Sequence, residues 1–266
     1  MLNKIFILTY GRSNSQVTWN NLPDIWKEKT YLVVQEREKH LYNNYPTIVL
    51  PDEVRNLPAT IEWVVKNNRD IRFGMFDDDL SFYRTRMTGE TWEGTKRKMT
   101  PEDFLELEET VCRWMDEGIV QCGMEVAWNI PDRDNEYKEI TRICANFFYD
   151  GPKIPADEID WTGSMYAENF HLILQLLKKG YKNRISNRFR IDTIATQSEG
   201  GCAVERTVEK HNDSMRALAE LHPGIVKLYE KETTGGQWKG TPKLAAKIAW
   251  KEAYKSSQVN SLDSFF

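Results

Sequence analysis

The sequence has no long hydrophobic run and few cysteines. None of its apolar stretches approaches the ~20 residues that a membrane-spanning helix needs, so no transmembrane segment is predicted. The cysteines are far apart and form no C-x-x-C pair, which argues against a zinc knuckle or a disulfide-stapled fold. The N-terminus lacks the apolar core of a signal peptide, so we expect a cytoplasmic protein without a membrane partner.

Neither sign of charge is in large excess. Lys and Arg number 36 against 40 Asp and Glu, giving a net charge of −4, so a polyanion could bind only at a local patch. The chain is 40% hydrophobic and 29% charged, which is typical of a folded globular protein and excludes a wholly disordered one. For 266 residues we expect one large domain, 1–200, with a C-terminal extension, 201–266, packed on it.

Short apolar runs alternate with helical stretches, which predicts an α/β fold with a mainly parallel sheet flanked by helices. Strands are predicted at 5–8, 31–34, 47–50, 71–76, 119–128, 143–149 and 184–191. Helices are predicted at 15–28, 60–68, 101–116, 167–179, 204–221 and 242–255. The C-terminal segment is therefore expected to be helical. In such sheets, ligands bind beyond the carboxyl ends of the parallel strands.

Three consecutive acids, Asp77, Asp78 and Asp79, follow the fourth predicted strand. Adjacent carboxylates repel one another, and a divalent cation neutralises them. Alternate residues of an extended chain point the same way, so Asp77 and Asp79 can share one ion while Asp78 binds a ribose hydroxyl or supports the site. Mg²⁺ and Mn²⁺ commonly take their remaining ligands from a bound diphosphate. The triplet therefore predicts a metal site for a nucleotide diphosphate.

Other interpretations of the triplet stay open. It could be a solvated turn, or the nucleophile motif of a haloacid-dehalogenase-type phosphatase, although that motif normally follows the first strand. A nucleotidyltransferase would share the acidic strand end and the nucleotide fold. A non-catalytic nucleic-acid-binding protein would explain basic stretches elsewhere but not the acids.

Six stretches carry a family resemblance: ILTYGRSNSQVTWNNLP (7–23), YLVVQERE (31–38), IVLP (48–51), FGMFDDDLSFYR (73–84), AENFHLILQLLKKGYKNRIS (167–186) and GGCAVERT (200–207). In this order they resemble GT-A glycosyltransferases, and among these the bacteriophage enzymes associated with TET/JBP oxygenases. The resemblance implies a GT-A, Rossmann-like fold and metal-dependent sugar transfer from a nucleotide-diphosphate donor, a UDP-sugar favoured. It implies a 5-hydroxymethylpyrimidine in DNA, such as 5-hydroxymethylcytosine, as acceptor, and the cytoplasm of an infected bacterium as location. A non-DNA acceptor is the alternative.

The resemblance also assigns roles to residues near the acidic triplet. Asp77 and Asp79 match the Mn²⁺- or Mg²⁺-binding pair, Asp79 being counted with the catalytic residues. Thr9, Gly11 and Arg12 match the loop that meets the nucleotide; Gly11 allows close backbone approach and Arg12 can pair with phosphate.

Further roles fall on residues distant in the sequence. Glu168 matches the helix-start acid that deprotonates the acceptor hydroxyl, and the helix dipole is expected to lower its pKa. The family pattern there is Glu-Asp, so Asn169 leaves the identity of the base open. His222 matches a further metal ligand, or simply marks a helix end. Glu36, after the second strand, is a candidate for contact with the base or ribose.

Two basic segments could bind DNA phosphates. Arg184 and Arg188 belong to a run of six basic residues without an acid between residues 178 and 190. Lys243, Lys247 and Lys251 recur every four residues and would form one stripe on the predicted terminal helix. A solvated helix face is the alternative explanation for this stripe. Candidates for stacking on a sugar or a base are Trp92, Trp161 and Trp238.

Overall fold

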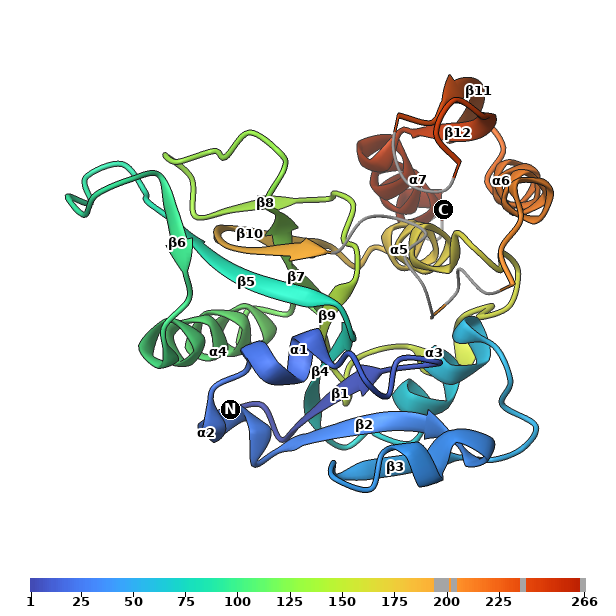
Figure 1. Ribbon diagram of the computed structural model, residues 1–266. Helices are drawn as coiled ribbons and strands as arrows, with labels where there is room; N and C mark the ends of the chain where they lie inside the picture. The colour runs from blue at the N-terminus through green and yellow to red at the C-terminus, as the bar shows by residue number, and fades with distance from the viewer. Residues whose placement is uncertain (194–200, 202–204, 235–237, 264–266) are drawn as a thin grey trace.

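The computed structural model describes residues 1–193, 201, 205–234 and 238–263, with side chains up to residue 258. Its large sheet contains β1 (Lys4–Leu8), β2 (Thr30–Gln35), β3 (Thr47–Leu50), β4 (Arg72–Asp77), β5 (Leu80–Thr85), β6 (Lys96–Lys98), β7 (Gln121–Val126), β8 (Tyr137–Glu139), β9 (Asn146–Asp150) and β10 (Asn183–Thr193). The strand order is β3-β2-β1-β4-β9-β7-β10-β5-β6, and β8 pairs with β10 (Figure 1).

The half of the sheet formed by β3, β2, β1 and β4 is parallel. β9 runs antiparallel between β4 and β7, and β7 pairs in parallel with β10. The carboxyl ends of β1, β4, β7 and β10 therefore lie along one edge of the sheet. In the register of β1 and β4, Leu8 stands beside Asp77, so the acidic triplet begins at this edge as predicted. The predicted α/β fold is confirmed.

Helices cover both faces of the sheet (Figure 1). α3 (Leu57–Lys66) and α5 (Glu168–Lys178) share a core with Phe6 of β1, whereas α2 (Asp24–Lys27) and α4 (Pro101–Asp116) share the opposite core with Ile5 and Ile7. Burial on both faces explains why the strands are almost continuously apolar. Short 3₁₀ helices are η1 (Glu36–Leu41) and η2 (Ala156–Glu158).

One predicted helix is interrupted. The stretch 15–28 forms α1 (Val17–Asn21) and α2, with Pro23 between them. Proline has no N–H to donate and is tolerated only at the beginning of a helix, and Pro23 indeed stands at the N-cap of α2. By contrast, α4 begins as predicted, with Thr100 and Asp103 forming a capping box.

The C-terminal part corrects the expectation of an all-helical segment. It contains α6 (Val208–Leu221), a hairpin of β11 (Val226–Glu232) and β12 (Pro242–Ile248), and α7 (Trp250–Asp263). The predicted helix 242–255 is therefore wrong over its first half. α7 packs against α5, and the hairpin packs against α6. No helix in the described ranges is long and apolar enough to cross a membrane.

Candidate active site

The acidic triplet occupies the tight connection between β4 and β5, and Thr18 of α1 fixes its backbone. The Thr18 hydroxyl donates to the Asp77 carbonyl (2.6 Å) and accepts the Leu80 N–H (2.8 Å). The Thr18 N–H donates to the Asp78 carbonyl (3.0 Å). α1 thus fixes the backbone of the acidic turn at the sheet edge.

Asp78 is the buried organiser of the triplet. Its Oδ2 accepts from the Thr9 hydroxyl (2.6 Å) and its Oδ1 accepts from Arg12 Nη1 (2.5 Å). Gln16 in turn donates to the Thr9 hydroxyl (2.9 Å) and to the Arg12 carbonyl (2.9 Å). Both Asp78 oxygens are used within the protein, which favours the supporting role over contact with a ribose. The predicted nucleotide loop and the predicted metal motif are thereby one hydrogen-bonded unit.

Asp77 and Asp79 carry the features of metal ligands. Burial raises the pKa of Asp77 well above its ordinary value, and the charges of Asp79, Asp78 and Glu168 raise it further. Asp79 Oδ2 accepts from Arg12 (3.2 Å), but Asp79 Oδ1 is buried without a hydrogen-bond partner among the described residues. A buried, unpartnered carboxylate oxygen in a repulsive cluster fits the site of a divalent cation.

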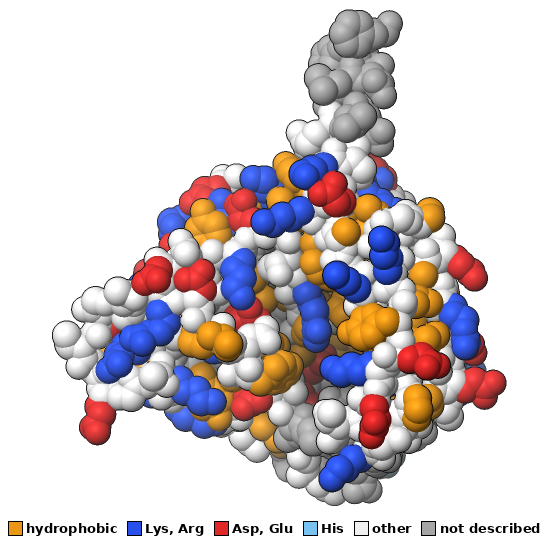
Figure 2. All heavy atoms as spheres, turned by 90° about the horizontal axis from the view of Figure 1, so that it is seen from above, with side chains coloured by type: hydrophobic (Ala, Val, Ile, Leu, Met, Phe, Trp, Pro, Cys, Tyr) orange, Lys and Arg blue, Asp and Glu red, His pale blue; other side chains and the backbone are white. Residues whose placement is uncertain are grey.

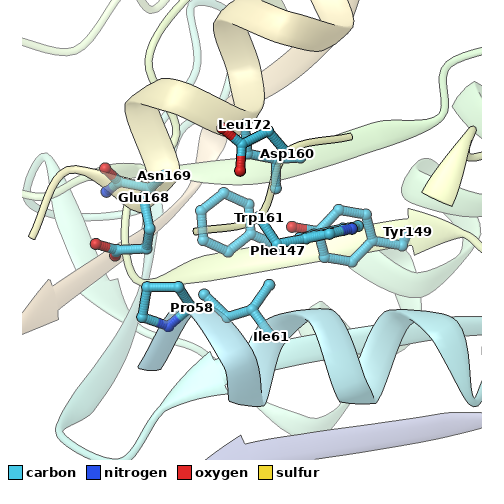
Figure 3. Close-up of a pocket in the computed structure, with 9 residues that line it drawn as sticks. All are labelled: Pro58, Ile61, Phe147, Tyr149, Asp160, Trp161, Glu168, Asn169 and Leu172. Atoms are coloured by element: carbon cyan, nitrogen blue, oxygen red, sulfur yellow. The ribbon is translucent and has the colours of Figure 1, made fainter. Parts of the chain in front are cut away.

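Glu168 begins α5 and faces the same region as Asp77. A recess lies between them, lined by Asp77, Glu168 and Asn169 and by apolar side chains that include Leu8, Leu57 and Phe147. A neighbouring space shares Glu168, Asn169, Ile61 and Phe147 (Figure 3). Figure 3 shows the Glu168 side chain leaving α5 toward Pro58 at the beginning of α3. The recess therefore sits at the carboxyl ends of β1 and β4 with one acid on either side.

The ionisation of Glu168 differs from expectation. Burial raises its pKa to about 7, although backbone hydrogen bonds at Glu168 and Asn169 and the charge of Arg206 lower it. The helix terminus lowers this pKa as predicted, but desolvation in the apolar recess outweighs it, so the helix terminus does not hold Glu168 fully ionised. The group is poised to exchange a proton near neutral pH.

Gly11 and Glu36 lie on the loops beyond β1 and β2. Gly11 has a φ of +67°, which requires glycine, and its N–H donates to the Glu38 carboxylate (3.0 Å). Glu36 is exposed at the start of η1, and its contact with a base or ribose stays a prediction. Sequence reasoning missed Glu38, although it belongs to the same YLVVQERE stretch.

His222 does not join the aspartates. Across the described ranges, no three His, Cys, Asp or Glu side chains form a group that could hold a metal, so the predicted set Asp77, Asp79 and His222 is not assembled. His222 is instead the buried C-cap of α6, and its Nε2 is hydrogen-bonded to His171 Nδ1 (2.8 Å). His171 Nε2 is in turn hydrogen-bonded to Asp160 Oδ2 (3.3 Å). His222 therefore marks the end of α6, which was the alternative to a metal ligand.

The predicted basic residues fall into two groups. Arg184 is hydrogen-bonded to Glu139 (2.9 Å) and Glu117, and Arg188 to Glu106, so acids distant in the sequence already neutralise both arginines. Lys243 and Lys247 lie on β12, and Lys251 lies in the first turn of α7. The predicted single helical stripe therefore does not exist, and the lysines need a new interpretation. The matched stretch at 200–207 lies partly outside the described residues.

Residues 3–202 match the sequence model of the TET-associated glycosyltransferases. The chain belongs to this family. It is therefore a glycosyltransferase-family enzyme, and of the interpretations left open by the acidic triplet, the phosphatase, the nucleotidyltransferase and the non-catalytic binding protein are set aside.

Two phage proteins are similar to this TET-associated glycosyltransferase. Each is named β-glucosyl-HMC-α-glucosyl-transferase, one from Enterobacteria phage T6 and one from phage T2. Both are 26% identical to the chain over 204 residues, which cover 72% of the chain and 71% of the relative.

Solved structures show weaker similarity. S. aureus TarS 1–349 in complex with UDP-GlcNAc superimposes with a TM-score of 0.46 at 13% identity, over 83% of this chain and 66% of that one. The inositol-1-phosphate CTP transferase from T. maritima gives a TM-score of 0.43 at 10% identity, over 84% of this chain and 97% of that one.

Proposed function

We propose that this enzyme transfers a sugar from a nucleotide-diphosphate donor, a UDP-sugar favoured, to a hydroxymethylated pyrimidine in DNA. The observation that carries the proposal is the position of Asp77 and Glu168 on one apolar recess at the carboxyl ends of β1 and β4. The TET association of the family and the HMC in the names of the phage relatives support DNA as the source of the acceptor.

Asp77 and Asp79 would hold Mn²⁺ or Mg²⁺, as the unpartnered Asp79 Oδ1 suggests. When bound, the cation would neutralise the acidic turn and the charge that develops on the departing diphosphate. Thr9, Gly11 and Arg12 are the proposed nucleotide loop. Because Arg12 is anchored to Asp78 and Asp79, this loop and the acidic turn keep a fixed relation to each other.

Glu168 is the proposed general base. The acceptor oxygen attacks the anomeric carbon of the donor, the bond from that carbon to the diphosphate oxygen breaks, and the hydroxyl proton passes to Glu168. A pKa of about 7 leaves a useful fraction ionised at neutral pH while keeping the carboxylate basic enough to take the proton. The apolar lining by Leu57, Ile61 and Phe147 limits water that would hydrolyse the donor.

The proposal is tested by following nucleoside-diphosphate release from a panel of nucleotide sugars with Mn²⁺ or Mg²⁺. We expect release to accelerate with hydroxymethylated DNA but not with unmodified DNA, and to stop with a chelator. A further arm uses DNA whose hydroxymethyl groups already carry a sugar. Donor hydrolysis that no DNA accelerates would move the acceptor to a non-DNA hydroxyl. Release from no donor would contradict the nucleotide-sugar proposal.

A further inference from the structure

One face of the β11–β12 hairpin gathers lysines that the sequence pattern did not connect. Alternate residues of a strand point to the same side, so Lys227, Tyr229 and Lys231 of β11 share a face with Lys243 and Lys247 of β12. The register places Lys231 directly opposite Lys243 and Lys227 directly opposite Lys247. We call these four lysines and Tyr229 the lysine face.

The lysine face is costly for the hairpin itself, because like charges directly opposite on paired strands repel. Among the described residues, the ion pairs include none that neutralises one of these four lysines. On the other face of the hairpin, Val226, Leu228 and Ile248 pack against the core, whereas Glu230 and Glu232 nearer the hairpin end are exposed. Lys227, Lys231 and Lys247 are exposed, whereas Lys243 is half-buried beside Trp238. Tyr229 between the two lysine pairs is 49% exposed. This arrangement favours an anionic partner.

Further cations and aromatic rings connect the lysine face with Glu168. Lys243 Nζ lies 5.5 Å from the centroid of the Trp238 ring, and the Arg206 guanidinium lies 5.8 Å from the same centroid. Arg206 is also 5.3 Å from the centroid of the Tyr166 ring, two residues before Glu168. The charge of Arg206 acts on Glu168, whose pKa it lowers against the dominant effect of burial. Positive charge thus extends from the hairpin to the proposed base.

His211 positions Arg206 between the lysine face and Glu168. Its Nδ1 is hydrogen-bonded to Arg206 Nη2 (2.6 Å), and its Nε2 to the carbonyl of Leu244, next to Lys243 (2.9 Å). Burial lowers the pKa of His211 to about 4, so the ring is neutral at pH 7. A carbonyl can only accept, so Nε2 carries the proton and Nδ1 accepts from Arg206. The hairpin backbone therefore fixes the guanidinium that stands near Glu168.

We infer that the lysine face binds the phosphate backbone of the acceptor nucleic acid and leads the strand, past Arg206, to Glu168. This inference rests on the proposed function. Lysines four residues apart in a strand are separated by about 13 Å, close to the rise of about four nucleotides. An exposed tyrosine between phosphate contacts can stack on a base. Figure 2 shows Lys and Arg side chains gathered around a hollow on the face seen from above.

The test compares Lys227→Gln/Lys231→Gln with a matched control, Lys27→Gln/Lys66→Gln. The control removes the same charge from helices α2 and α3, where each lysine pairs with an acid of its own helix. Binding of a labelled hydroxymethylated DNA oligonucleotide is followed by fluorescence anisotropy over a series of salt concentrations. Losing two phosphate contacts should reduce the slope of log affinity against log salt by about 1.4 for a single strand, or about 1.8 for a duplex. We expect a roughly tenfold weaker affinity near 0.1 M salt, and wild-type behaviour from the control.

Two further measurements separate the inference from the proposed function. Because each substitution removes repulsion between opposed lysines, the melting temperature should not fall, and donor hydrolysis without DNA should stay at the wild-type level. If the wild type glycosylates DNA but the lysine-face variant binds DNA as tightly as the wild type, the inference is overturned and the proposed function still stands. DNA binding through the lysine face without any transfer supports the inference and contradicts the function. An oligonucleotide that the wild type does not bind overturns the inference.

Discussion

Replacing Glu168 with Gln should strongly reduce sugar transfer and at the same time stabilise the protein at alkaline pH. Burial raises the Glu168 pKa from its ordinary 4.5 to about 7, so the folded protein binds this proton more tightly than the unfolded chain does. Protonated Glu168 makes its full contribution to the free energy of unfolding below about pH 4.5. This contribution is lost as the pH rises through about 7. The difference between the two pKa values corresponds to at most about 3 kcal/mol. Glu168→Gln retains the shape and removes this penalty.

The assay is urea unfolding of wild type and Glu168→Gln at pH 5 and pH 8, together with sugar transfer at pH 8. We expect a gain in the free energy of unfolding at pH 8 that approaches this limit, a much smaller gain at pH 5, and a roughly 10²–10⁴-fold loss of transfer. Glu209→Gln, an exposed acid in the first turn of α6, is the control and should show no such pH-dependent gain. Two results would refute this reasoning. One is sugar transfer by Glu168→Gln at the wild-type rate, and the other is an equal gain in the free energy of unfolding at pH 5 and pH 8.

Three other predictions concern Glu168 and the acidic turn. The value of kcat/KM should rise about tenfold per pH unit below pH 7 and level off above it, because Glu168 must lose its proton to act; a flat profile from pH 5 to pH 9 would contradict a role as base. Asp79→Asn should lose Mn²⁺ binding in calorimetry and transfer by more than about 100-fold while remaining folded in circular dichroism; wild-type turnover would remove Asp79 from the proposed metal site. Arg12→Gln should lower the free energy of unfolding by about 3 kcal/mol at pH 8 and by less at pH 5, because Asp78 and Asp79 lose their buried cation and their pKa values rise further; urea unfolding showing the larger loss at pH 5 would contradict this.

The sequence alone predicted the parts of the fold that depend on local pattern. The first four strands and the acidic turn after β4 follow from short apolar runs ending in polar residues, and the structure confirms them. The hairpin was missed because a lysine at every fourth position aligns on one side of a helix and also on one face of a strand. Only the pairing of β12 with β11 distinguishes the two.

In the candidate site, too, some features follow from local sequence pattern and others depend on tertiary packing. The neighbourhood of Thr9, Arg12 and Asp78 follows from the ends of adjacent parallel strands, which the sequence could indicate. The pKa of Glu168 depends on how deeply α5 is packed, and the pairing of His222 with His171 depends on how α6 ends against α5. Both are properties of tertiary packing, so a helix-start acid and a helix-end histidine gave no reliable signal.

Mass spectrometry of nucleosides tests the proposed sugar transfer to a hydroxymethylated base in DNA most directly. Hydroxymethylated DNA is incubated with the enzyme, Mn²⁺ and a panel of nucleotide sugars, and then digested to nucleosides. With the wild type, we expect the modified nucleoside to gain the mass of one hexose or pentose. With Glu168→Gln and with Asp79→Asn, we expect this gain to disappear. A donor that is consumed while every nucleoside keeps its original mass would contradict the proposed transfer.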